Sequence, residues 1–230
     1  MNQLGIKAKS PRTKYKSYKG ECGKICPNLL LEKEVNEGKN ITKFTRNFST
    51  STVNQKWTTD ISEFHIASGK LYLSPILDMN NREIVAYSIS KSPSYNQITD
   101  MLDSAFQKYE NLDGLIFHSD QGWQYQMYDY RQRLKTKGII QSMSRKGNCL
   151  DNSLMENFFG VMKNEMFYGH EYEFKSLEEL ELAMKEYIFY YNNQRITVKL
   201  KGLSPVIYRQ QSMEDILISL DFVARSNYWG

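Results

Sequence analysis

The stretch that decides the fold reads HSDQGWQY at residues 118–125 and SMSRKGNCLDNSLMENFFGVMKNE at residues 142–165. Asp120 directly follows a short apolar run and is therefore predicted at the end of a buried strand. Glu156 falls in a segment whose apolar residues recur at helical spacing, namely Leu154, Phe158, Val161 and Met162. We expect one carboxylate on a strand end and the other in the first turns of a helix.

A third carboxylate, Asp60, lies upstream in KWTTDISEF at residues 56–64, where Trp, Thr and Ile favour a strand. Asp151 or Asn152 can cap the Glu156 helix, which can then lean over the two strands. Acids without a Cys or His cluster suit Mg²⁺, a hard ion held by a few carboxylates and by substrate phosphate oxygens. The pattern predicts one metal site for phosphoryl transfer, in which paired ions serve the attacking and the leaving oxygen.

These acids, together with WTTDI, HSDQGWQY, SRKGNCLDNS, ENFFGVMKNE and YYNNQR followed by LSP, resemble the catalytic subunit of bacterial insertion-sequence transposases of the retroviral-integrase type. The resemblance implies an α/β, ribonuclease H-like core, with a mixed five-stranded sheet flanked by helices. It implies that Asp60, Asp120 and Glu156 are the catalytic residues and bind two Mg²⁺ or Mn²⁺ ions. It further implies strand cleavage and strand transfer on double-stranded DNA, at transposon ends and target, by a homo-multimer assembled on the DNA.

Two other classes remain open at this stage. One is a catalytically inactive, DNA-binding transposase remnant, and the other is a ribonuclease H-like nuclease that hydrolyses DNA without joining it. The expected organisation is a basic arm and linker at residues 1–53, the integrase-like core with a helical extension at 54–211, and a tail at 212–230. The family resemblance makes the arm the remnant of a truncated helix-turn-helix region.

The charge of the chain is unevenly distributed. Residues 1–24 hold seven Lys or Arg and one Glu, a net charge of +6, so the remainder carries −2 of the total of +4. The Lys, Arg and Tyr of this arm suit a phosphate backbone, although a merely solvated tail has the same composition. Three Cys and three scattered His predict reduced thiols and no zinc module. No signal peptide or membrane span is predicted, so the expected compartment is the bacterial cytoplasm, with DNA-bound protein on the nucleoid.

The apolar periodicity and the turn residues predict an antiparallel meander followed by strands that alternate with helices. The predicted strands are 57–66, 70–79, 83–90, 115–118 and 139–142, and the predicted helices are 94–109, 126–137 and 176–192. Ser176 and Glu179 form a capping box. Residues 29–52 are predicted to be a linker.

The expected DNA contacts surround the three acids. Arg145, Lys146 and Asn148 lie in a Gly-containing loop directly before the Glu156 helix, where cations can neutralise phosphate. Lys163 returns to the helix face of Glu156 after two turns. Gln124 and Arg195 complete the set, although Gln124 and its neighbours Gln121, Gly122 and Tyr125 could equally hold Asp120 in place.

Four other ionisable residues are assigned away from the metal site. Asp78 is expected to be a turn residue and Glu63 to lie on the opposite strand face from Asp60. Glu165 falls on another helix face. His118 is expected to make a structural hydrogen bond in preference to acting as a base.

Overall fold

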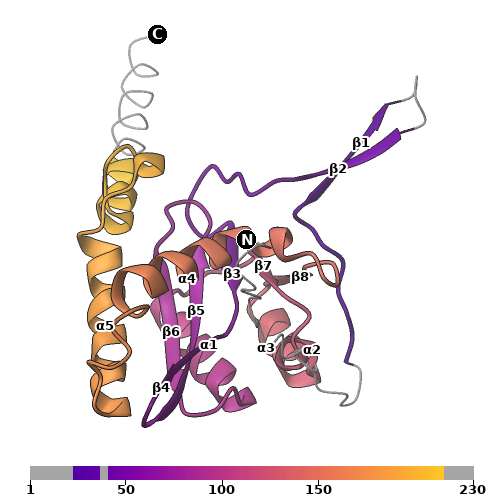
Figure 1. Cartoon of the computed structure of the whole chain (residues 1–230). Helices are drawn as coiled ribbons and strands as arrows, with labels where there is room; N and C mark the ends of the chain where they lie inside the picture. The colour runs from indigo at the N-terminus through magenta and orange to yellow at the C-terminus, as the bar shows by residue number, and fades with distance from the viewer. Residues whose placement is uncertain (1–22, 37–40, 215–230) are drawn as a thin grey trace, which may run out of the picture.

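The computed structural model describes residues 23–36 and 41–214, and the basic arm at residues 1–22 lies outside this part. One sheet is covered by helices on both faces, and a two-stranded ribbon projects from it (Figure 1). The strands of the sheet are β3 (Lys56–Thr59), β4 (Ser62–Ile66), β5 (Gly69–Asp78), β6 (Ile84–Ser90), β7 (Ile116–Ser119) and β8 (Ile140–Met143). The predicted α/β class with a mixed sheet is confirmed.

The first predicted strand is split into β3 and β4. Both halves pair with β5 in one continuous antiparallel register, with Thr59 opposite Ile76 and Ser62 opposite Leu73. The interruption falls at Asp60, which this register places opposite Pro75, a residue without an N–H to donate. If β3 and β4 are counted as one strand, the sheet has the five predicted strands. The first of them is broken at Asp60.

The second half of the sheet is parallel. β3 pairs with β7 with Thr58 opposite His118, and β7 pairs with β8 with His118 opposite Ser142. Parallel neighbours need crossover connections, which the helices of the chain supply. In the antiparallel half, consecutive strands pair with one another: β4 with β5, and β5 with β6. Their connections are therefore hairpin-like.

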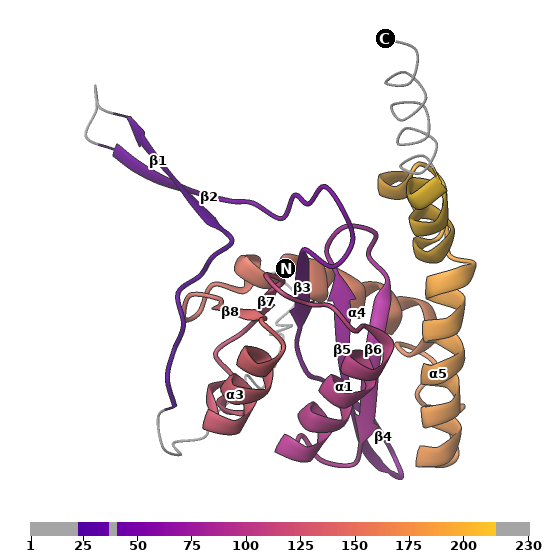
Figure 2. The same ribbon diagram turned by 180° about the vertical axis from the view of Figure 1, so that it is seen from behind.

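Helices pack on both faces of the sheet, and each face has its own apolar core. α1 (Tyr95–Lys108) and α3 (Tyr128–Thr136) cover one face, where Trp57, Met101 and Phe117 are buried (Figure 2). α4 (Ser153–Met166) and α5 (Leu177–Asn193) cover the other face, over a core that includes Met155, Phe158, Met162, Leu180 and Met184. Burying one such side chain stabilises the fold by about 1.5–3 kcal/mol. The helix that carries Glu156 is therefore fastened to the sheet along its length.

The predicted linker at residues 29–52 is wrong in part, because it contains β1 (Leu31–Asn36) and β2 (Ile41–Arg46). These strands pair antiparallel and form the ribbon that projects from the core in Figure 1. The Asn47 N–H donates to the Leu30 carbonyl at 2.7 Å, which closes the base of the ribbon. A ribbon that does not pack on the core needs no alternating apolar face, so sequence periodicity gives little sign of it.

The helices agree with the predictions with two differences. The helix predicted at 126–137 is divided into α2 (Trp123–Gln126) and α3, which is followed by Gly138 at a φ of +70°. At the start of α5, Ser176 Oγ accepts from the Glu179 N–H at 3.2 Å, but the Glu179 carboxylate accepts from the Lys175 N–H, not from that of Ser176. Short 3₁₀ turns, η2 (Cys149–Asn152) and η3 (Val198–Leu200), and a helix at 205–214 complete the described chain.

Within residues 23–36 and 41–214, no helix combines the length and the apolar character that crossing a membrane requires.

Candidate active site

Asp60 and Asp120 come from adjacent parallel strands. The pairing of Thr58 with His118 puts each acid two residues further along its strand, at the end of the parallel ladder. Burial, followed by the charge of Asp120, raises the pKa of Asp60 to about 7, with Glu156 acting in the same direction and Lys163 against it. The register of β3 and β7 thus places Asp60 beside Asp120, and the charges of Glu156 and Lys163 also act on Asp60.

The backbone after β7 holds Asp120 in place. The Gly122 N–H donates to Asp120 Oδ1 at 2.8 Å, and a Cβ at residue 122 would come within 2.9 Å of the same oxygen. The turn is tied to the next strand by Gln121 Nε2, which donates to the Ser144 carbonyl at 3.0 Å. Of the two roles left open for this turn, holding Asp120 is the one that these contacts support for Gly122. Burial raises the pKa of Asp120 as well.

Glu156 is exposed in the first turn of α4, on the side of the sheet where this helix packs. Among residues 23–36 and 41–214, no three His, Cys, Asp or Glu side chains are gathered closely enough to hold a metal ion. The chemistry of the three acids nevertheless fits Mg²⁺ or Mn²⁺, since all their donors are carboxylate oxygens. Burial and the charge of Asp120 disfavour the ionised form of Asp60. A nearby cation would stabilise that ionised form.

His118 has the structural role expected for it. The ring is fully buried, and its Nδ1 and Nε2 each lie 2.9 Å from a serine hydroxyl, that of Ser142 and that of Ser144. Burial lowers the pKa of His118 to about 4. The imidazole is therefore neutral at pH 7 and ties β7 to β8 beneath Asp120.

Asp151 does not cap α4 and instead joins two distant segments, around Asn28 and Arg46, to its own loop. Its buried carboxylate accepts from Arg46 Nε at 2.7 Å, from Arg145 Nε and Nη2 at 2.9 Å each, and from Asn28 Nδ2 at 3.0 Å. Burial opposes ionisation, but these donors hold the pKa of Asp151 well below its usual range. Sequence reasoning missed this cluster, because nothing in the local spacing links Arg46 or Asn28 to a loop more than a hundred residues away.

The candidate DNA contacts divide into those near the acids and those with other partners. Lys163 is half-buried, with Nζ 4.9 Å from the centre of the Phe64 ring, and burial lowers its pKa against the opposing charges of Glu63 and Asp60. Lys146 and Asn148 are exposed on either side of Gly147, whose φ is +74°. The loop before α4 therefore presents the side chains of Lys146 and Asn148 to the surface, and their contact with DNA stays a prediction.

Gln124 and Arg195 lie in different surroundings from those expected. The Gln124 amide is buried and donates to the Pro93 carbonyl at 3.1 Å, which fastens α2 to the start of α1. Arg195 forms a 2.6 Å ion pair with Glu165, which also accepts from Tyr187 at 2.7 Å. Gln124 nevertheless lies close to one of the acids, since a Cβ at residue 122 would come within 2.9 Å of Asp120 Oδ1 and within 3.1 Å of Gln124 Oε1.

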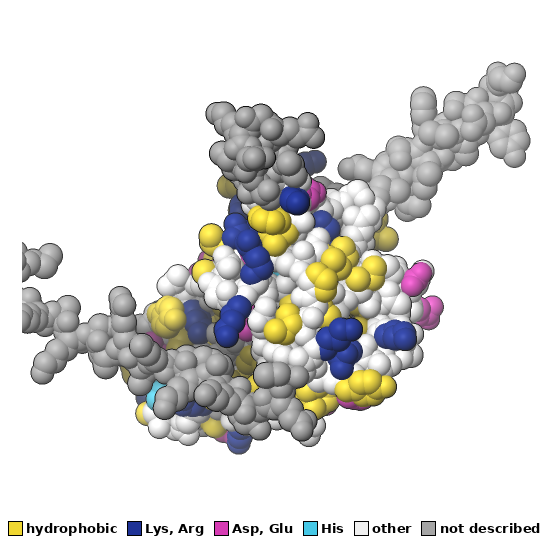
Figure 3. Space-filling model, turned by 90° about the vertical axis from the view of Figure 1, so that its right-hand side faces the viewer, with side chains coloured by type: hydrophobic (Ala, Val, Ile, Leu, Met, Phe, Trp, Pro, Cys, Tyr) yellow, Lys and Arg dark blue, Asp and Glu magenta, His cyan; other side chains and the backbone are white. Residues whose placement is uncertain are grey.

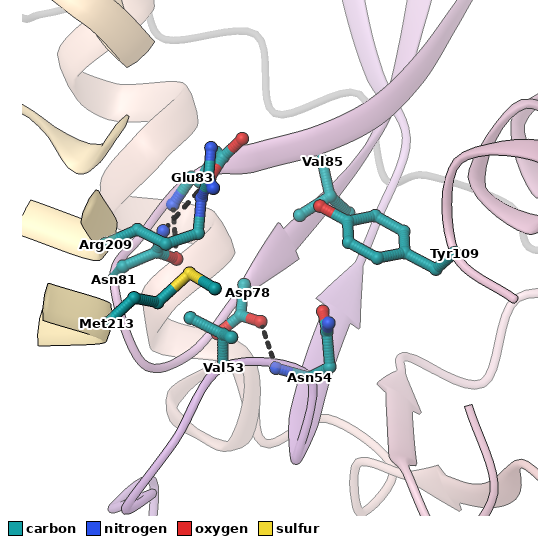
Figure 4. A pocket seen from close by; sticks show the side chains of 9 residues that line it. All are labelled: Val53, Asn54, Asp78, Asn81, Glu83, Val85, Tyr109, Arg209 and Met213. Carbon is teal, nitrogen blue, oxygen red and sulfur yellow. Dashed lines mark hydrogen bonds and ion pairs between the residues drawn. The ribbon is translucent and has the colours of Figure 1, made fainter. Parts of the chain in front are cut away.

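Asp78 was predicted to be a turn residue and is the last residue of β5, where it contacts the turn that follows. Its carboxylate accepts from the Asn54 N–H at 2.6 Å, from the Asn80 N–H at 2.7 Å and from Trp57 Nε1 at 3.1 Å. It lines a pocket of about 130 Å³ beside Glu83, Tyr109 and Arg209 (Figure 4). This pocket contains none of the three candidate acids. Glu63, a second excluded acid, pairs with Lys70 at 2.8 Å.

The surface beside β8 and α3 is shown in Figure 3, which views the molecule from the right-hand side of Figure 1. Lys and Arg side chains are spread over this face among uncharged and hydrophobic ones, and the visible acids lie mainly towards its edges. Such a surface is electrostatically compatible with a polyanionic partner.

Two family models, both described as "Integrase core domain", match residues 50–149 and residues 156–213. The fold is also similar to a chain of the simian T-cell lymphotropic virus intasome, with a TM-score of 0.53 and 15% identity over 64% of this chain and 51% of that chain. A second similar structure is the HTLV-2 integrase catalytic core domain in complex with magnesium, with a TM-score of 0.52 and 16% identity over 70% of this chain and 99% of that chain. The architecture is that of the ribonuclease H-like integrase catalytic cores.

Closer relatives come from bacteria. The "Uncharacterized transposase-like protein" of Haemophilus influenzae is 51% identical over 93% of this chain and 91% of the relative. The "Putative transposase InsK for insertion sequence element IS150" of Escherichia coli is 46% identical over 92% of this chain and 69% of the relative. The chain belongs to the insertion-sequence transposases of the integrase superfamily, a class of polynucleotidyl transferases that act in DNA integration and recombination.

Proposed function

We propose that this transposase cuts and joins DNA strands at the ends of an insertion sequence, using Asp60, Asp120 and Glu156 as its catalytic and metal-binding residues. The observation that carries the proposal is the parallel pairing of β3 with β7, which places Asp60 beside Asp120 at the end of the ladder. The raised pKa of Asp60 agrees with it, since burial contributes first, then Asp120, and Glu156 also adds. Two acids that both act on the carboxyl of a third support the assignment of all three to one site. A magnesium-bound integrase core with a similar fold supports Mg²⁺ as the cofactor. Mn²⁺ as an alternative and two ions as the number are part of the proposal, because paired ions can serve the attacking and the leaving oxygen.

Each acid has a distinct part in this proposal. Asp120 is held by the Gly122 N–H and Asp60 by the Ile61 N–H at 2.8 Å each, so both carboxylates are oriented before a cation arrives. Glu156, which is exposed, would be the third ligand. Two ions held by Asp60, Asp120 and Glu156 would supply activation of a water or a DNA 3′-hydroxyl for in-line attack and stabilisation of the departing 3′-oxygen. No side chain of the protein has to act as a nucleophile.

DNA is proposed to approach over the loop before α4 and along the side of α4 that carries Lys163. Lys146 and Asn148 are exposed and can contact phosphate directly. Arg145 and Arg195 would have to exchange their carboxylate partners, Asp151 and Glu165, for phosphate oxygens. Because two DNA ends must be brought together, a homo-multimer assembled on DNA is part of the proposal, and an intasome chain of similar fold is consistent with it.

The test is a strand-cleavage and strand-transfer assay on oligonucleotides that carry the terminal repeats found beside the coding sequence. Wild-type protein is compared with Glu156→Gln in the presence of Mg²⁺, of Mn²⁺ and of a chelator. Metal-dependent cleavage and joining by the wild type, both lost in Glu156→Gln, support the proposal. Hydrolysis without joining would indicate a nuclease, and binding without cleavage would indicate an inactive remnant.

A further inference from the structure

Asn152 occupies the N-cap position of α4 but does not cap the helix. Its side chain makes no hydrogen bond to the first turn, and the residue is only 5% exposed. Asn152 Oδ1 accepts instead from the Thr58 hydroxyl, and Asn152 Nδ2 donates to the Thr59 carbonyl at 3.1 Å. One buried amide therefore connects the start of α4 to β3 through both its donor and its acceptor.

The two ends of this connection lie next to the candidate acids. Thr59 directly precedes Asp60, and Asn152 precedes Glu156 by four residues, about one helical turn. The amide thus links the strand that carries one acid to the helix that carries another. An N-cap residue normally accepts from the helix itself, so the loss of this cap bond is compensated by contacts with the sheet.

We propose that Asn152 is a positioning residue, which sets the separation between Glu156 and the Asp60–Asp120 pair by joining α4 to β3. The inference rests on the proposed function of the three acids. Ligands of a metal site must be held to within about 0.5 Å of their productive geometry, and side chains behind the ligands supply that constraint. A buried amide with two satisfied hydrogen bonds is suited to this, because any sliding of the helix breaks both bonds.

The apolar core does not make this constraint redundant. Met155, Phe158 and Met162 fasten α4 to the sheet, but apolar contacts are not directional and permit small shifts. The hydrogen bonds of Asn152 are directional and define one register. For the same reason, a variant that lacks the amide is expected to keep α4 on the sheet and to remain folded.

A matched control exists on α5. Asn192 also joins a helix to a strand, with Oδ1 accepting from the Ile84 N–H and Nδ2 donating to the Ile84 carbonyl at 2.9 Å each. This second amide links α5 to β6, away from the candidate acids. Asn152→Ala and Asn192→Ala therefore remove comparable hydrogen bonds, and only the first removes them beside the site.

The experiment measures thermal unfolding of the whole chain while Mn²⁺ is titrated, without DNA. Both alanine variants should unfold at a lower temperature than the wild type in the absence of metal. For Asn152→Ala, the Mn²⁺ concentration that gives half of the maximal stabilisation should rise about 10- to 100-fold. For Asn192→Ala it should stay at the wild-type value.

Two Thr58 variants give a second measurement that leaves Asn152 in place. Thr58→Val removes the hydroxyl and should raise the Mn²⁺ concentration that gives half of the maximal stabilisation. Thr58→Ser keeps the hydroxyl and should have the wild-type value. An unchanged Mn²⁺ midpoint in both Asn152→Ala and Thr58→Val would overturn the positioning role while leaving the proposed function intact. A wild-type protein that neither responds to Mn²⁺ nor cleaves DNA would overturn the proposed function and this inference with it.

Discussion

Asp60 and Asp120 leave adjacent parallel strands side by side, and burial together with the charge of Asp120 raises the pKa of Asp60 to about 7. In the unfolded chain Asp60 loses its proton near pH 3.9. Between about pH 3.9 and pH 7 the folded state therefore binds a proton that the unfolded chain has lost. The stability of the metal-free protein therefore decreases as the pH rises through this interval. Above about pH 7 the folded protein carries the full free-energy cost of an ionised, buried Asp60.

Asp60→Asn removes this cost and should raise the unfolding temperature of the metal-free protein at about pH 8. The gain should shrink as the pH is lowered towards 5, because the carboxyl of the wild type is then protonated in the folded state. Thermal unfolding in the presence of a chelator measures both values. Asp100→Asn, at an exposed position on α1, is the control. An equal gain at both pH values would contradict the assigned cause.

Asp120→Asn should abolish both DNA cleavage and joining while leaving DNA affinity close to that of the wild type. Residues behind a metal ligand contribute about 10- to 100-fold, so loss of a ligand should exceed a hundredfold. The amide still accepts from the Gly122 N–H, so the turn should keep its shape. Gel assays of cleavage and fluorescence anisotropy of binding give the two quantities. A variant that cuts at the wild-type rate would remove Asp120 from the site.

Lys163→Ala should weaken DNA binding and reduce its dependence on salt. Each phosphate contact contributes about 0.9 to the slope of log affinity against log salt concentration, so one lost contact should lower the slope by about that amount. The control is Lys185→Ala, since Lys185 is exposed on α5 and pairs with Glu181. If the slope is the same in both variants and the wild type, Lys163 does not contact the backbone of DNA.

His118 should make the protein less stable in mild acid. The pKa of His118 is lowered by burial to about 4, whereas the unfolded chain binds the proton near pH 6.5. Stability attributable to this ring is therefore complete above about pH 6.5 and decreases as the pH falls towards 4. Urea unfolding of the wild type and of His118→Gln should show a smaller acid loss in the variant.

At about pH 7.5, His118→Gln should be destabilised by about 1–3 kcal/mol, because Ser142 or Ser144 loses its partner. His65→Gln, on the exposed side of β4, should behave like the wild type at both pH values. If His118→Gln loses as much stability at low pH as the wild type does, another group is responsible for that loss.

The sequence was sufficient to predict the elements that carry the three acids. Apolar strands before Asp120 and around Asp60, and helical periodicity around Glu156, are local signals, and the structure has a strand or helix at each place. The burial that raises the pKa of Asp60 arises only when strands far apart in the sequence meet, so no local pattern could have predicted it. The three acids as a site remain a prediction.

Contacts between distant polar residues were beyond sequence reasoning for a similar reason. Asp151 and Asn152 looked like capping residues because both types commonly cap helices. In the fold their side chains bond to Arg46 and Thr58, residues that only the tertiary structure brings near. Gln124 and Arg195 were predicted as DNA contacts, with a role in holding Asp120 left open for Gln124. Each has a protein partner that its own neighbourhood in the sequence does not reveal.

The ribbon of β1 and β2 begins and ends at one place, since Leu30 and Asn47 are hydrogen-bonded neighbours. The chain therefore leaves the core at Leu30 and returns to it beside the same residue. An in-frame loss or gain of codons between these two residues would therefore let the chain re-enter the core at the same place, although a loss that included Arg46 would also remove a donor to Asp151. Copies of this gene could thus diverge in length here through single genetic events.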